Sequence, residues 1–132
     1  MSKLKIQNQK VNIKSDVKIR SYHFSILILE FISYFPQKKV YWSLGDQLMR
    51  SATSIGSNIV EAKSSSSKRE FIKYYDIALK SSNETKYWLY LLRDSVLSKE
   101  LNKSSINFLL NEAVEISNML GSALLTMKNK RI

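Results

Sequence analysis

The side chains that most often carry out chemistry are scarce in this sequence. His23 is the single histidine and there is no cysteine, so chemistry that needs a second histidine, a thiol or a disulfide is excluded. His23 precedes Phe24 in an apolar run, where a lone histidine is far more often a surface or core-edge residue than a catalyst. We expect no catalytic role for it.

Carboxylates could bind a metal if several of them met inside the fold. The candidates on the helical runs are Glu30, Glu61, Asp76, Glu84, Glu112 and Glu115. Dinuclear bundles use a Glu-x-x-His pair on two helices, and this chain has no such pair. Glu112 and Glu115 are three residues apart, but we expect them beside the apolar stripe of their helix. We predict no metal and no cofactor.

A serine-rich stretch, SIGSNIVEAKSSSSK at residues 54–68, resembles a phosphate-binding loop only in composition. It lacks the G-x-x-x-x-G-K-[ST] pattern, and no buried strand precedes it. A serine without an adjacent base is also a weak nucleophile. We therefore expect a protein that is not an enzyme.

The elements that carry these residues are predicted to be long helices. The chain of 132 residues holds only 3 Gly and 1 Pro, too few turn residues for a sheet-rich fold. Apolar residues recur at helical spacing in four runs, which predicts an all-α, antiparallel up-down four-helix bundle over residues 15–132 after a basic arm at residues 1–14. The expected helices run from about 15 or 16 to 35, from 40 to 62, from a Ser67 cap to about 95, and from 102 or 104 onward.

Polar residues on two of these helices suggest a structural seam. Ser54, Asn58 and Glu61 follow i, i+4, i+7 spacing beside an apolar line, so they share one helix face. Asn83 and Glu84 are the candidate matching half on the next helix. The alternative is that all five face solvent. Gly45 and Gly56 lie inside a helix, where each costs about 1 kcal/mol relative to Ala, and we expect close approach of another backbone to offset that cost.

The chain is strongly basic, with 21 Lys+Arg against 11 Asp+Glu and a net charge of +10. Such a field attracts phosphate-bearing polymers or anionic membrane surfaces, although it is also compatible with a merely soluble basic surface. Candidate phosphate contacts near helix ends are Lys38, Lys39, Lys63, Lys68 and Arg69. The start of the chain lacks a signal-peptide core, and the run 24–35 is too short to span a bilayer, so we expect a cytoplasmic protein with no membrane role.

Helix two and the turn after it resemble a known family. SATSIGSNIVEA followed by SKREF, with SSNETKYWLYLLRDS further on, is similar to the bacterial 23S ribosomal RNA intervening-sequence proteins. The matching positions are Ser54, Ile55, Asn58, Ile59, Glu61, Lys68, Glu70, Phe71, Asn83 and Glu84. The sequence departs where the family has Gly after the Glu and a Gly-Arg-rich turn. Ala62, Lys63 and serines 64–66 stand there instead, which weakens any expectation of close backbone contact with a ligand at this turn.

The resemblance implies an up-down four-helix bundle, and some relatives assemble as homopentameric rings. It also points to a related basic bundle, the accessory variability protein of diversity-generating retroelements, which works with RNA and a reverse transcriptase. Two functions follow as expectations. The first is a non-catalytic homo-oligomer, a pentamer by resemblance, that binds nucleic acid, RNA in preference. The second is a protein-interaction scaffold that docks a partner protein and has no direct nucleic-acid role.

Overall fold

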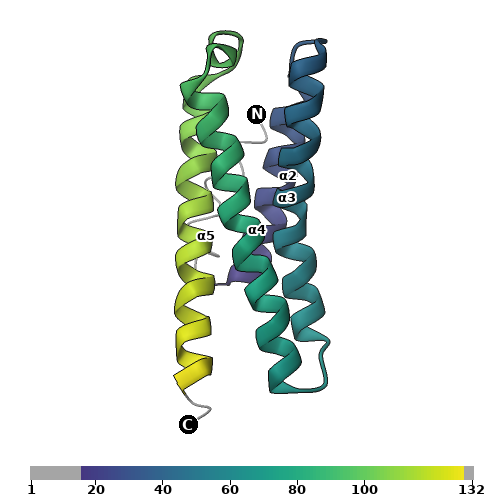
Figure 1. Ribbon diagram of the computed structural model, residues 1–132, viewed down its shortest axis with the longest axis vertical. Coiled ribbons are helices and arrows are strands. Elements are labelled where there is room, and N and C mark those ends of the chain that lie inside the picture. Colours follow the sequence, from purple (N-terminus) through teal and green to yellow (C-terminus); the bar gives the residue numbers. More distant parts are fainter. Residues whose placement is uncertain (1–15, 130–132) are drawn as a thin grey trace.

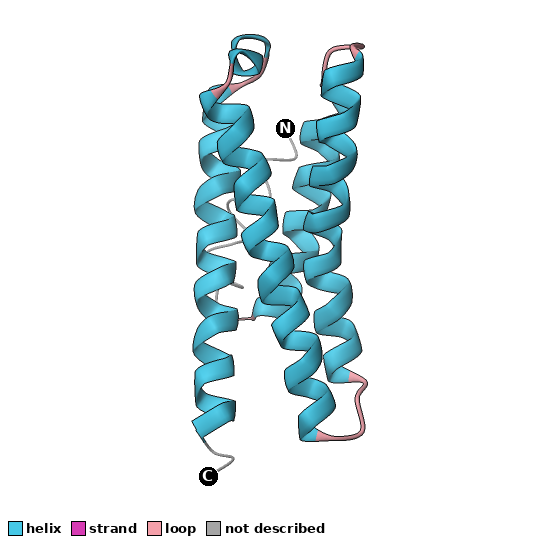
Figure 2. Cartoon of the chain, viewed as in Figure 1, coloured by secondary structure: helices cyan, strands magenta, loops and turns pink. Residues whose placement is uncertain are grey.

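The computed structural model describes residues 16–129 of the chain (Figure 1). The described elements are α2 (Val17–Ser33), α3 (Lys39–Lys63), α4 (Lys68–Asp94), the short 3-10 helix η1 (Val96–Glu100) and α5 (Lys103–Asn129). Successive helices run in opposite directions and are joined by short connections, and Figure 2 shows no strand among the described residues. The predicted all-α, up-down four-helix bundle is confirmed. The basic arm predicted at residues 1–14 lies outside the described residues.

Side-chain caps begin the helices where the sequence suggested. Asp16 Oδ1 accepts hydrogen bonds from the backbone N–H of Lys18 and of Ile19, at 3.0 and 3.2 Å. Ser67 Oγ accepts from the Glu70 N–H at 3.1 Å, as the capping-box pattern predicted. The Glu70 carboxylate reaches back one residue further than in the standard box, to the Ser66 N–H at 3.3 Å.

Helix boundaries differ slightly from the prediction. The first helix ends at Ser33, two residues before the predicted Phe35, because the residue before Pro36 is disfavoured in the helical conformation. The helix η1 was not predicted. The Ser95 hydroxyl accepts from the Leu97 N–H at 3.3 Å and starts this turn, which places Val96 outside α4 and leaves it 70% exposed.

The core is a continuous apolar column contributed by all four long helices. Its fully buried members include Ile28, Leu48, Leu89 and Leu120. The small residues Ala52, Ala78 and Ala113 are also fully buried, which lets neighbouring helices pack closely. The α3–α4 contact is the most extensive in the bundle, and the α2–α5 contact is much smaller.

Both glycines of α3 lie against α2, as expected for positions of close approach. A Cβ on Gly56 would be 3.7 Å from the Ser21 Cβ and 3.8 Å from the Ser21 carbonyl group, so another backbone does pass close by. At Gly45 the neighbours are side chains, with Ile32 Cγ2 at 3.3 Å from a Cβ placed there. Gly45 is therefore the more tightly packed of the two.

Candidate nucleic-acid interface

Three of the candidate basic residues meet at one end of the bundle. Lys63 is the last residue of α3, and Lys68 and Arg69 are the first two of α4, on either side of the turn 64–67. All three side chains are exposed. Lys63 and Lys68 line a shallow hollow together with Met127 of α5. The C-terminal end of α5 lies at the same end of the molecule (Figure 1).

Lys38 and Lys39 lie at the opposite end, at the start of α3. Lys38 Nζ is 3.0 Å from Glu100 Oε2, and this hydrogen bond raises the pKa of Lys38 above its ordinary value. The antiparallel course of α3 thus separates the five candidates into two groups. They cannot form one contact surface within a single chain, and only the group at the turn 64–67 has all its cations without a salt bridge among the described residues.

The expected polar seam exists, with different members. Ser54 Oγ of α3 is 2.9 Å from Ser81 Oγ of α4, and Asn58 Nδ2 donates to the Ser54 carbonyl and hydroxyl at 2.8 and 3.0 Å. Glu61 is exposed, one turn beyond this contact. Asn58 therefore fixes the serine that crosses to α4, and the carboxylate takes no part.

Asn83 and Glu84 are not the matching half of the seam in the chain. Both are exposed, and Glu84 Oε2 accepts from the Trp88 indole N–H on its own helix at 3.1 Å. The inward residues are hydroxyls one or two positions away. Thr85 Oγ1 is 2.9 Å from Ser51 Oγ, and Ser82 Oγ is 2.7 Å from Ser117 Oγ of α5. Ser82 and Thr85 follow helical spacing with the apolar Ala78, Leu89 and Leu92 of the same helix. Polar residues on such a stripe are the signal that could have identified them.

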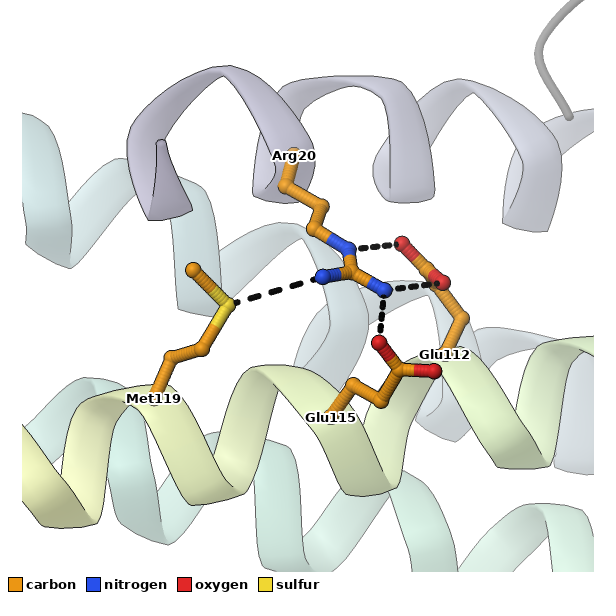
Figure 3. A network of polar contacts seen from close by, with 4 residues as sticks. All are labelled: Arg20, Glu112, Glu115 and Met119. Carbon is orange, nitrogen blue, oxygen red and sulfur yellow. Dashed lines mark hydrogen bonds and ion pairs between the residues drawn. The ribbon is translucent and has the colours of Figure 1, made fainter. Parts of the chain in front are cut away.

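A buried ion pair joins α2 to α5, and the sequence reading missed it. Arg20 is 3% and Glu112 4% exposed, and Arg20 Nε and Nη2 donate to the two oxygens of Glu112 at 2.6 and 3.0 Å. Nη2 also donates to Glu115, and Nη1 lies 3.7 Å from Met119 Sδ (Figure 3). The hydrogen bond with Glu112 raises the pKa of Arg20 above its ordinary value, against the opposing effect of burial.

The position of Glu112 corrects an expectation, since we placed it beside the apolar stripe of its helix. Glu112 belongs to the buried face because Arg20 neutralises it there. Arg20 precedes Phe24 and Leu27 at i, i+4, i+7 spacing, so it stands on the apolar stripe of α2, and a buried Arg usually has an acidic partner. Among residues 16–129 no group of three or more His, Asp or Glu side chains is arranged to hold a metal ion.

These features define the class of protein: a basic antiparallel four-helix bundle with a hydroxyl-lined α3–α4 seam and a buried α2–α5 ion pair. The family model of the 23S rRNA-intervening sequence protein matches residues 14–122, and the chain belongs to that family. A solved structure of a protein with unknown function from the S23 ribosomal protein family of Bacteroides thetaiotaomicron is similar, with 33% identity and a TM-score of 0.73. The match covers 82% of this chain and 97% of that one. No curated protein gives a significant match.

Proposed function

We propose that this chain is a non-catalytic, homo-oligomeric bundle of the cytoplasm that binds RNA through its basic surface. The observation that carries the proposal is the exposed cluster of Lys63, Lys68 and Arg69 around the turn 64–67. We call these three residues the basic end. Lys128, in the last turn of α5, adds a fourth cation nearby, which pairs with Asp76 at 3.3 Å.

The basic end combines two properties that suit a phosphate backbone. Its cations are exposed and can exchange water and counterions for phosphate oxygens, a reaction that weakens steeply with salt. The first turn of α4 also presents the N–H groups of Lys68 and Arg69, which have no helical acceptor and lie at the positive end of the helix dipole. The arrangement reads charge and shape, and it offers no set of side chains for recognising bases.

The outer face of α2 supports assembly into an oligomer. Ile19, Tyr22, Ile26 and Leu29 are all 37–64% exposed. Their 3-4-3 spacing is that of the a and d positions of a coiled-coil seam. Since Phe24, Leu27 and Ile28 cover the inner face of the same helix, α2 is apolar on both sides, which is typical of a helix buried by an additional partner. A ring of such chains, pentameric by resemblance, would multiply the +10 charge of each subunit.

A protein-interaction scaffold is the second candidate function. Tyr34, Trp42 and Tyr87 are 55–78% exposed, and large aromatic side chains are frequent anchors of protein interfaces. In this case the same apolar and aromatic surface would bind a partner protein, and the charge would only keep the chain soluble.

The test is a titration of labelled structured RNA and of duplex DNA at about 50 and 200 mM salt, with the oligomer mass measured by light scattering in the same buffers. We expect an oligomer that binds RNA more tightly than DNA and loses most of its affinity at the higher salt. A stable oligomer that binds neither polymer at low salt would refute the RNA proposal and favour the scaffold.

A further inference from the structure

The outward face of α4 carries a line of cations that leads away from the basic end. Arg69, Lys73 and Lys80 are exposed, and their separations of four and seven residues are close to one and two helical turns, so they share one face. Tyr87 follows seven residues further on the same line, and Tyr90 lies about one turn beyond it. The line from Arg69 to Tyr87 is about 27 Å long, at a rise of about 1.5 Å per residue. Helix α4 lies along the near side of the bundle in Figure 1.

The positive charge of this face is not neutralised by the acidic residues of the same helix. All four carboxylates of α4 already have a partner, which is Lys128 for Asp76, Arg93 for Asp94, the Trp88 indole N–H for Glu84 and the Ser66 backbone N–H for Glu70. Lys73 and Lys80, by contrast, form no salt bridge among the described residues. A ligand that follows this line should therefore carry negative charge along its length.

The line ends in two aromatic rings that are exposed and held in place by their neighbours. Tyr87 is 58% and Tyr90 40% exposed. The Tyr87 ring meets the Trp88 ring edge-on at 5.0 Å between centroids, and the Trp88 indole is fixed by its hydrogen bond to Glu84. The Arg93 guanidinium carbon lies 4.8 Å from the centre of the Tyr90 ring. Rings that are fixed before binding lose little conformational entropy when a flat ligand stacks on them.

We propose that this face of α4 binds a single strand of RNA, with phosphates on the cations and bases stacked on Tyr87 and Tyr90. Cations that follow the backbone and aromatic rings on which bases stack are the two elements by which proteins bind single strands without sequence preference. A protein partner fits this face less well, because Leu91 is the only large aliphatic residue exposed on α4. The inference rests on the proposed RNA binding by the basic end, and it adds a preference for single strands, since the bases of a duplex are stacked on one another and cannot reach the tyrosines.

Fluorescence anisotropy with the full-length chain tests the stacking, using a labelled oligouridylate of about 12 nucleotides and a duplex RNA of the same length. Tyr87→Ala with Tyr90→Ala should weaken binding of the oligouridylate by about tenfold or more and binding of the duplex by less than about twofold. Retained duplex binding also shows that the variant is folded. Tyr87→Phe with Tyr90→Phe keeps both rings and should keep the affinity for the oligouridylate. Tyr34→Ala, which removes an aromatic side chain that is 78% exposed outside α4, is the matched control and should change neither affinity.

The salt dependence of oligouridylate binding separates the cations of this face from its tyrosines. Lys73→Gln with Lys80→Gln should lower the slope of log affinity against log salt by about 1.4, because two phosphate contacts are lost, whereas the tyrosine variants should leave the slope unchanged. Oligouridylate binding that is insensitive to Tyr87→Ala with Tyr90→Ala, or weakened equally by Tyr34→Ala, would overturn the inference. A parent protein that binds the duplex at least as tightly as the oligouridylate would also overturn it and leave the proposed function intact. A parent protein that binds neither RNA would overturn both.

Discussion

Arg20 and Glu112 stand 92 residues apart in the sequence and share two parallel hydrogen bonds inside the bundle. Both side chains are about 95% withdrawn from solvent, so water does not readily replace either partner if it is removed. The pair therefore joins the first helix of the bundle to the last. Removing one of its members should destabilise the fold by much more than the intact pair stabilises it.

Removing one member of this pair should destabilise the fold severely. We expect Arg20→Ala to lower the free energy of unfolding by about 3–5 kcal/mol, because it takes the shared cation from the buried Glu112 carboxylate. Glu112→Ala should cost less, because Arg20 keeps its ion pair with Glu115. The double replacement Arg20→Leu with Glu112→Leu should recover most of that loss. Urea denaturation of the parent, the two single variants and the double variant measures these free energies. A double variant as unstable as the single ones would show that apolar side chains cannot replace the ion pair at this site.

Substitution of Asn58 in the hydroxyl seam should lower the stability of the fold, whereas substitution of the exposed residues of the same motif should not. Asn58→Ala removes the amide that holds Ser54 toward Ser81, and we expect a loss of about 1 kcal/mol. Asn83→Ala and Glu61→Ala should change stability by less than about 0.5 kcal/mol, because both side chains are exposed. If Asn58→Ala proves as neutral as these two controls, the seam does not stabilise the bundle.

The glycines should differ in their response to alanine. Nothing lies within 4 Å of a Cβ added at Gly121, so Gly121→Ala should gain about 1 kcal/mol from helix propensity alone. Gly45→Ala should gain less or lose stability, because Ile32 Cγ2 would lie 3.3 Å from the new Cβ. Thermal unfolding of both variants gives the comparison, and the reverse order would mean that the packing at Gly45 adapts freely.

Charge reversal at the two ends of the bundle should separate the proposed RNA-binding surface from the rest. Lys68→Glu with Arg69→Glu should abolish RNA binding at about 200 mM salt and lower the slope of affinity against salt. The matched control is Lys38→Glu with Lys39→Glu, which changes the net charge equally at the opposite end and should weaken binding much less. Equal losses would indicate that overall charge, and not the basic end, governs binding.

Tyr41 should make the protein less stable in alkali. Its hydroxyl donates to the Leu97 carbonyl at 2.9 Å, and burial, followed by the nearby Glu100, raises the pKa of this phenol. The stability that depends on neutral Tyr41 is intact below the unfolded pKa of about 10 and is lost as pH rises through the raised folded pKa. Between pH of about 8 and 11, Tyr41→Phe should therefore lose less stability than the parent protein. A parallel decline of the two would rule out this cause.

The sequence was sufficient for the architecture because the apolar spacing of α3, α4 and α5 is regular and Pro36 and Ser67 mark the boundaries. Register across the bundle could not be read in the same way. Helical spacing along α4 separates the inward Ser82 and Thr85 from the outward Asn83 and Glu84. Which hydroxyl of a neighbouring helix each inward residue meets depends on the rotation of α4 against that helix, which is determined by packing. The short helix η1 begins at the Ser95 cap. In the sequence this serine looks like the end of the preceding helix, so η1 was not predicted.

The candidate site was predicted residue by residue but not as a surface. The sequence identified Lys38, Lys39, Lys63, Lys68 and Arg69 as near helix ends, which is where they lie. Their separation into two groups follows once alternating helix directions are applied to those ends. Predicting the Arg20–Glu112 pair would have required knowing that α2 and α5, the helices furthest apart in the sequence, are in contact. Residue spacing within one helix gives no information about that contact.

The connections of the bundle determine the order in which its parts can meet. Each of α3, α4 and α5 folds against a neighbour joined to it by a short segment, whereas α2 reaches α5 only after the rest of the chain has been brought round. Loop closure over that distance is entropically expensive, so we expect this contact to form late in folding. A bundle that turns in the opposite hand would present another face of α2 to α5 and bury Arg20 without Glu112. We therefore expect the ion pair to favour one handedness of the bundle.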